Sequence, residues 1–564
     1  MIRHRRVAIG GPAFLLLLFS LWPAGLLSAS PDTRPNILLI VADDLGFADL
    51  GSFGGEIPTP NLDALAYAGL RFTDFQAAPA CSPTRAMLLS GVDNHRAGLG
   101  NMAEELSPNQ TGQPGYEGYL NARVVTVATQ LRDAGYHTYL SGKWHLGLTP
   151  ELGPGARGFE RSFVQLSGAS HFADMQPSYA PDPKAKAKYL QDDVPLTTLP
   201  ENFSYSSQFH ADNLINYIER DRASGKPFFG FLSFTAPHWP LQLPDDQLES
   251  FAGSYDAGYD ALYDQRWQRM VSMGLIKADA AKPPRPPKAV PWESLSSEQQ
   301  AIEARSMEIY AGMVQQMDYH TGRVITYLKS RGLLDNTLIV FLSDNGAEGH
   351  DLDDTWPADT FPKIRRVIDA RFDFSYANMG RPNSYTMYGP GWARAGAPHL
   401  RMYKAFPSEG GTRVAAFATF PGRIAKGVTS NALVSVKDIA PTLLDFAGIE
   451  PHQGEYRGRK VEPMSGWSLR SMLQSGEAEE SFDDRELGME LFGKYAYRRG
   501  PWKMTIMPHP YGSGEAELYN LDRDPGETTN LAKEQPDLLA QLIVNWQHYA
   551  KENGVILPDW VSGY

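Results

Sequence analysis

Five short apolar runs, four of which lead into polar or ionisable residues, constrain the fold of this chain more than any other feature. They are Asn36–Ala42, Tyr136–Leu140, Phe228–Phe234, Thr337–Ser343 and Val414–Phe420. Continuous apolar runs of this length are typical of strands buried on both faces, as in a parallel sheet. Helix-like stretches lie between them, including Val127–Ala134 and Ile302–Leu328. The alternation predicts an α/β fold, a three-layer α/β/α sandwich around a mostly parallel central sheet.

The polar residues that follow four of these runs point to one shared site. In open α/β sheets, ligands bind beyond the carboxyl ends of the strands. Any one of these endings, taken alone, would be interpreted as a turn or a cap. Four endings at one edge of a sheet instead predict a common site, formed by Asp43 and Asp44, Lys143 and His145, His238, and Asp344 and Asn345.

The C-terminal part of the chain has a different pattern. Tyr495–Met507 and Glu517–Leu521 resemble strands of a smaller antiparallel sheet. We therefore expect a catalytic α/β domain over 31–450 and a C-terminal α+β subdomain over 451–564. Long ordered loops often form binding walls. Three polar segments are expected to be such loops over the sheet edge: 170–200, 280–291 and 349–398.

The first thirty residues have the features of an export signal. Three arginines precede an apolar run, Ala13–Trp22, and the small-residue trio Ser28–Ser30. This order predicts a cleaved signal peptide over 1–30, because the run is short for a bilayer span of about 20 residues. Cleavage would leave no stable membrane span. A chain with one cysteine forms no intrachain disulfide, which favours a bacterial periplasmic or secreted protein.

The charge balance argues against nucleic acid as a partner. The formal net charge of −13 becomes −16 without the three arginines of the first thirty residues. A surface this acidic repels a polyanion, whereas the local field of a pocket can still attract a small anionic substrate.

The single cysteine, Cys81, precedes a predicted helix start. Pro83 favours the first helical turn, and Arg85 would lie one turn inside the helix. A helix N-terminus attracts anions and lowers the pKa of a thiol. A guanidinium at this position can hold a tetrahedral oxyanion or the nucleophile itself. These residues predict a nucleophile that faces an anionic substrate.

Oxygen donors dominate the predicted site. Asp43, Asp44, Asp344 and Asn345 offer carboxylate and amide oxygens. Hard oxygen donors suit Ca²⁺ or Mg²⁺, whereas Zn²⁺ prefers histidine or cysteine. The residues therefore predict a calcium or magnesium site.

Several blocks of the sequence resemble one family. Cys81-Ser82-Pro83-Thr84-Arg85, with its continuation to Gly91, resembles the signature of type I sulfatases in the alkaline-phosphatase-like superfamily. The long blocks around Cys81, Lys143 and Lys404 are most similar to bacterial arylsulfatases. Other matching blocks are 35–46, 142–147, 236–240, 343–346, 404–413 and 517–531.

The resemblance implies a specific chemistry for Cys81. A formylglycine-generating maturation enzyme would convert Cys81 to formylglycine (3-oxoalanine) before folding. One hydroxyl of the hydrated aldehyde attacks the sulfur of a sulfate ester and releases an alcohol or phenol. The second hydroxyl then loses its proton, and collapse to the aldehyde expels sulfate. The substrate is expected to be a small-molecule sulfate monoester, foremost an aryl sulfate.

The resemblance also implies the roles of the surrounding residues. One calcium ion would be held by Asp43, Asp44, Asp344, Asn345 and the oxygen of the modified residue 81. Lys143, His238 and Lys404 would bind the sulfate group, and His238 with Lys404 would protonate the leaving oxygen. Asp344 would accept the proton of the attacking hydroxyl, and His145 would assist collapse of the diol intermediate. Arg85 completes the catalytic set, and Glu409 and Arg413 are expected to be scaffold.

Two other functions are compatible with these motifs. A phosphonate or phosphate ester hydrolase of the same superfamily commonly has histidine at the position of Asn345, so Asn345 favours sulfate. A non-catalytic sulfoglycan-binding relative would keep Cys81 unmodified. The motifs leave the alcohol part of the ester and the oligomeric state open, with a monomer favoured.

Overall fold

The central sheet contains all five predicted strands. β1 (Asn36–Ala42) lies between β7 (Phe228–Ser233) and β8 (Thr337–Ser343) and runs parallel to both. β3 (His137–Lys143) is parallel to β7, and β9 (Arg413–Thr419) is antiparallel to β8. The strand order β10-β2-β9-β8-β1-β7-β3-β4-β5-β6, with β11 beside β2, confirms the mostly parallel sheet. The other strands are β2 (Leu70–Gln76), β4 (Arg161–Gln165), β5 (Tyr189–Gln191), β6 (Val194–Pro195), β10 (Val428–Ser430) and β11 (Val434–Ser435).

This computed structural model describes residues 1–2, 8, 33–168, 171–172, 186–352 and 361–560. Its contacts divide the chain into Met1–Thr33 and Arg34–Tyr564, and the sheet belongs to the second unit. The signal peptide expected over 1–30 lies almost entirely outside the described residues. Among the helices described, none has the length and apolar character needed to span a bilayer.

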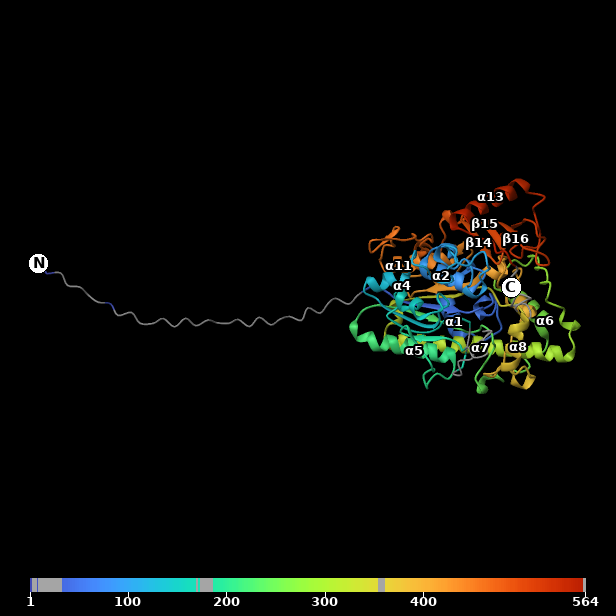
Figure 1. The fold of residues 1–564 in the computed structure, drawn as a ribbon, viewed down its shortest axis with the longest axis horizontal. Helices are drawn as coiled ribbons and strands as arrows, with labels where there is room; N and C mark the ends of the chain where they lie inside the picture. Colours follow the sequence, from blue (N-terminus) through green and yellow to red (C-terminus); the bar gives the residue numbers. More distant parts are fainter. Residues whose placement is uncertain (3–7, 9–32, 169–170, 173–185, 353–360, 561–564) are drawn as a thin grey trace. The chain divides into compact units, whose positions relative to one another are not determined.

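Helices cover both faces of the sheet, which confirms the three-layer sandwich (Figure 1). Leu38 and Ile40 of β1 enter one hydrophobic core, and the alternate residues Ile37 and Leu39 enter a second. The first core is closed by α1 (Pro60–Ala68), α5 (Ser206–Asp221), α6 (Gly258–Ser272), α7 (Ser297–Ser330) and α9 (Gly389–Gly396). The second is closed by α2 (Cys81–Ser90), α3 (Asn94–Ala97), α4 (Val127–Asp133), α11 (Ile439–Phe446) and α12 (Arg470–Ser475).

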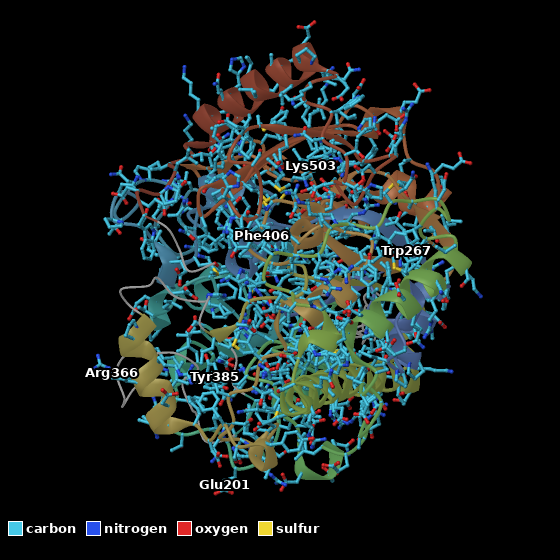
Figure 2. The ribbon with its side chains drawn as sticks, turned by 90° about the vertical axis from the view of Figure 1, so that its right-hand side faces the viewer. Glu201, Trp267, Arg366, Tyr385, Phe406 and Lys503 are labelled. Atoms are coloured by element: carbon cyan, nitrogen blue, oxygen red, sulfur yellow. The ribbon has the colours of Figure 1, made fainter. Side chains whose placement is uncertain are left out.

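The C-terminal part has the predicted antiparallel sheet. Its elements are β14 (Glu486–Leu491), β15 (Lys494–Arg499), β16 (Trp502–Ile506), β17 (Glu517–Asn520) and α13 (Pro536–Asn553), preceded by the short pair β12 (Glu455–Tyr456) and β13 (Arg459–Lys460). Tyr497 and Met504 pack with α13 on one face. Lys503, on the other face, places its Nζ 2.7 Å from the Glu409 carboxylate. Figure 2 shows Lys503 in this sheet, near Phe406 of the segment that follows β8.

The loop prediction is correct for 280–291 and wrong for parts of the other two segments. Residues 280–291 contain no helix or strand. Strands β5 and β6 fall within 170–200, and 349–398 contains α8 (Phe361–Arg371) and α9. The helix α9 was not predicted because its sequence is rich in glycine. Gly391 is needed there because an added Cβ would lie 2.5 Å from the Tyr259 ring of α6. The last short helix is α10 (Glu409–Thr412).

A buried histidine connects α3 to the C-terminal sheet and makes stability depend on pH. His95 Nδ1 lies 3.0 Å from Asp93 Oδ1, and Nε2 lies 3.4 Å from Glu490 Oε2 of β14. Although burial opposes the charged form, these carboxylates raise the pKa of His95 to about 9. A raised pKa stabilises the fold fully below the unfolded value near 6.5. This contribution, on the order of 3 kcal/mol, should therefore be lost as pH rises from about 6.5 through about 9.

Denaturant unfolding of the wild type and His95→Gln at several pH values tests this expectation. The variant should be less stable at pH 6, and the difference should shrink toward pH 9.5, where the wild-type imidazole is also neutral. A difference that stays constant across this range would contradict the assignment.

Candidate active site

The carboxyl ends of three strands of the central sheet bring several of the predicted residues together. Asp43 and Asp44 follow β1, Lys143 ends β3, and Asp344 follows β8. Cys81 begins α2, directly beside them. All five side chains are buried. The one shared site expected from the strand endings is therefore present as a cluster of contacting groups.

Cys81 faces two carboxylates. Its Sγ lies 3.4 Å from Asp43 Oδ1 and 3.6 Å from Asp44 Oδ1. Burial raises the pKa of the thiol well above its ordinary value, and the Asp344 carboxylate raises it further. This direction is opposite to the lowered thiol pKa expected from the helix N-terminus.

The oxygen donors form a compact, buried set. Ligand atoms of Asp43, Asp44, Cys81 and His238 all lie within 4.8 Å of one another. Asn345 Nδ2 donates to Asp44 Oδ1 at 2.7 Å, and its Oδ1 has no hydrogen-bond partner in the described part of the chain. Burial raises the pKa of Asp43 to about 7, although Lys143 opposes this. Because ionising these buried carboxyl groups is costly, the cluster favours a bound cation that compensates their charge.

Two lysines approach the cluster from different elements. Lys143 Nζ lies 2.8 and 2.7 Å from the two carboxylate oxygens of Asp43. Lys404 Nζ lies 2.9 Å from Asp44 Oδ2 and 3.0 Å from Glu348 Oε2. Both predicted lysines therefore point toward the carboxylates beside Cys81.

Arg85 is occupied by protein acceptors. Its Nε and Nη2 donate to Asp344 Oδ2 at 2.9 and 2.7 Å. Its Nη1 donates to the Lys143 carbonyl and to Ser233 Oγ, at 3.1 and 2.6 Å. These partners lie at the ends of β8, β3 and β7, so Arg85 ties three strands together. They differ from the oxyanion or nucleophile that the sequence suggested for this guanidinium.

The two predicted histidines have different partners. His145 Nε2 lies 2.8 Å from Glu104 Oε1, and its Nδ1 is buried without a hydrogen bond among the described residues. His238 Nε2 lies 3.5 Å from Asp44 Oδ2, and its Nδ1 donates to the Trp239 carbonyl. Burial, Lys143 and Lys404 hold the pKa of His238 well below its usual range. Nε2 is therefore the ring nitrogen of His238 that faces the carboxylate cluster.

Sequence reasoning missed several groups that support these residues. Glu348 accepts from His350 Nδ1 at 2.7 Å as well as from Lys404. Glu104 pairs with His145, and His171 Nε2 donates to the His238 carbonyl at 3.1 Å. Glu348 lies four residues after Asp344, so its place beyond a strand was a usable signal. Glu104 and His171 lie in segments without a recognisable pattern.

The segment 349–398 contributes part of the wall behind His238. Tyr385, labelled in Figure 2, places its ring centroid 5.6 Å from that of Trp239. The rings of His238 and Trp239 lie 4.7 Å apart. Trp239 and Tyr385 are both buried, so they hold the loop of His238 in place.

Comparison with known proteins decides the family. The family model described as sulfatase matches residues 35–449, which is most of the chain. The chain belongs to the sulfatase family. This sulfatase is 43% identical to an uncharacterized sulfatase of Schizosaccharomyces pombe, with 93% of this chain and 95% of the relative covered. It is 39% identical to an arylsulfatase of Klebsiella aerogenes, with 80% of this chain and 94% of the relative covered.

A solved structure supports the fold of this sulfatase. The crystal structure of Ps i-CgsB in complex with k-i-k-neocarrahexaose superposes with a TM-score of 0.64 at 23% identity. The superposition covers 94% of this chain and 95% of the other. At this identity the likeness concerns the architecture alone. Membership of the sulfatase family makes the chain a sulfuric ester hydrolase, and the site described above is its candidate catalytic centre.

Proposed function

We propose that this sulfatase hydrolyses aryl sulfate monoesters to a phenol and inorganic sulfate, with a nucleophile made from Cys81. The observation that carries the proposal is the convergence of Cys81, the aspartate pair and two lysines in one buried cluster. Lys143 and Lys404 place two positive charges on carboxylates that contact Cys81. Such an arrangement suits an anionic ester at residue 81. The 39% identity to an arylsulfatase supports the aryl class.

Cys81 needs chemical conversion to serve as the nucleophile. Burial beside carboxylates disfavours a thiolate at this position, and the sulfatase signature that begins at Cys81 supports its conversion. A formylglycine at position 81, formed by a maturation enzyme, would supply a hydrated aldehyde and hence an oxygen nucleophile. The carboxylates at 3.4 and 3.6 Å would then face a hydroxyl instead of a thiol.

The donor set fits one Ca²⁺. Asp43, Asp44, Asp344 and Asn345 would hold it, together with an oxygen at position 81. Asn345 Oδ1, which has no hydrogen-bond partner among the described residues, and the raised pKa of Asp43 both fit a hard cation at this position. When bound, Ca²⁺ would neutralise sulfate oxygens and lower the pKa of the hydroxyl at residue 81.

The remaining residues either bind the sulfate group or transfer protons. Lys143, His238 and Lys404 bind the sulfate group, and His238 with Lys404 delivers a proton to the leaving oxygen. Asp344 accepts the proton of the attacking hydroxyl, and Arg85 holds Asp344 in place. His145 assists release of sulfate, with Glu104 fixing its ring.

Two measurements test this function. Mass spectrometry of the peptide that contains Cys81, from protein made in a host with the maturation enzyme, should show an aldehyde or its hydrate. Values of kcat/KM for 4-nitrophenyl sulfate should exceed those for an aryl phosphonate ester. An intact thiol in active protein, or a large preference for the phosphonate, would overturn the proposal and favour the phosphonate hydrolase alternative. An intact thiol without activity would indicate the sulfoglycan-binding alternative.

Removal of the metal should lower both activity and stability. Dialysis against EGTA should reduce kcat for 4-nitrophenyl sulfate at least tenfold, and added Ca²⁺ should restore it. The same addition should raise the unfolding temperature, because a ligand at 100 times its Kd stabilises the folded state by about 2.7 kcal/mol. Asn345→Ala should weaken both responses. Unchanged activity in protein shown by elemental analysis to be metal-free would contradict the calcium assignment.

The proposal includes export. The signal-like order of residues 1–30 and the single cysteine support a periplasmic or secreted enzyme. N-terminal sequencing of the protein from the periplasmic fraction of the producing bacterium should find the mature chain starting near residue 31.

A further inference from the structure

A cavity lies outside the catalytic cluster. Its volume is about 310 Å³, at the lower end of small-molecule sites. It lies where β2, the segment after α6 and the turn after β17 meet. The residues that matter for its chemistry are Thr73, Lys277, His399, Arg413 and Arg523. None of its lining residues belongs to the catalytic cluster.

The shape of β2 opens this cavity. The pairing of β2 with β9 shifts register between Phe72 and Phe75, which leaves Thr73 and Asp74 in a bulge. Bulges re-aim side chains and are frequent beside functional sites. Here both bulge residues line the cavity. The Thr73 carbonyl accepts a hydrogen bond from Arg413 Nε and so fixes the guanidinium against the wall.

The two Nη groups of Arg413 are available to donate hydrogen bonds to a ligand. Within the described part of the chain, neither Nη atom makes a hydrogen bond. Its nearest carboxylates are Glu409, 3.6 Å from Nη1, and Asp74, 4.0 Å from Nε. Both carboxylates have closer partners, because Lys503 lies 2.7 Å from Glu409 and Arg498 lies 2.6 Å from Asp74. Two parallel N–H groups of an arginine match an oxyanion in bidentate geometry.

A neutral histidine and two exposed cations complete the cavity. His399 is 3% exposed, and its Nδ1 has no hydrogen-bond partner among the described residues. Burial and Arg413 hold the pKa of His399 well below its usual range, so the ring can donate one hydrogen bond without a charge. Lys277 and Arg523 lie at the exposed rim, and the Arg523 side chain has no ion pair in the described structure.

We infer that this cavity binds a tetrahedral oxyanion, a sulfate or phosphate group, with Arg413 and His399 at its inner wall and Lys277 and Arg523 at its rim. Three cationic side chains face one cavity of a chain whose net charge is −13. Asp74 and Asp522 also line it, but Asp74 is neutralised by Arg498 and Asp522 is exposed. Such a local field concentrates small anions against the overall charge.

Crystals soaked in selenate test the site directly. Anomalous scattering should show a peak beside the Arg413 Nη atoms, separate from any peak at the catalytic cluster. Titration calorimetry with inorganic sulfate and with phosphate then identifies the preferred oxyanion, and acetate tests whether a planar carboxylate also binds. A peak at the catalytic cluster alone, or acetate binding as tightly as sulfate and phosphate, would overturn the inference.

Variants separate this site from the catalytic one. Arg413→Gln should weaken binding in the cavity about tenfold. Because Arg413 also donates to the backbone of β2, the exposed pair Lys277→Ala/Arg523→Ala serves as a second test that leaves this contact intact, and it should weaken binding several-fold. Lys329→Ala/Lys551→Ala removes two exposed charges elsewhere and should leave binding unchanged. Hydrolysis of 4-nitrophenyl sulfate should stay within twofold in both double variants. Cavity binding unaffected by Arg413→Gln and by the Lys277/Arg523 pair would contradict the site.

Discussion

Cys81→Ala should lower kcat for 4-nitrophenyl sulfate by about 10⁴-fold or more, because it removes the precursor of the nucleophile. The fold should survive. Cys81 is a small buried residue at the start of α2, and the change removes one sulfur atom. A substitution of this size should cost about 1 kcal/mol of unfolding free energy. Steady-state kinetics and thermal unfolding of wild type and variant, prepared side by side, measure both effects.

The neighbouring residue offers a matched control. Ser82 is equally buried, and its Oγ has no hydrogen-bond partner among the described residues. Ser82→Ala therefore changes the same helical turn without removing the nucleophile, and kcat should remain within a few-fold of the wild type. If Cys81→Ala retained more than about 1% of wild-type activity, the nucleophile would have to be another group.

The sheet was predictable wherever the strands were uniformly apolar. β1 and β8 are such strands, and their pattern alone gave their bounds to the residue. β2 (LRFTDFQ) was not predicted as a strand, because it carries polar residues although it lies in a buried sheet. Arg71 donates to the Ser52 carbonyl at 2.7 Å, and Asp74 pairs with Arg498, more than 400 positions away. Such partners are contributed by tertiary structure, so no local pattern reports them.

The site was predictable to the same extent. Residues that directly follow strands, such as Asp43 and Asp344, could be placed because the ends of parallel strands meet at one edge. Glu104 could not, because it contacts His145 from a segment without a recognisable pattern. The pKa of the Cys81 thiol was also misjudged. The sequence predicts that Cys81 begins a helix, whereas its burial beside Asp344 depends on how β8 and α2 pack together.

Arg85→Met should have the largest effect on stability of any single substitution in the site. It removes the donor groups that join Asp344, the Lys143 carbonyl and Ser233. Asp344 would then be a buried carboxylate without its guanidinium partner at 2.7 Å. Removal of one member of a buried ion pair typically costs about 3–5 kcal/mol. We also expect kcat/KM to fall at least 100-fold, because the ends of β3, β7 and β8 lose their common anchor.

Two further variants separate the loss of stability from the loss of chemistry. Arg85→Lys keeps the charge but loses the bidentate geometry, so it should recover part of the stability and less of the activity. Arg485→Met breaks another buried pair, in which Arg485 Nη2 lies 2.6 Å from Asp438 Oδ1 and neither residue belongs to the candidate site. It should destabilise the protein to a similar degree and leave kcat of the folded enzyme within a few-fold. Equal losses of kcat in Arg85→Met and Arg485→Met, measured well below both unfolding temperatures, would show that Arg85 serves only the fold.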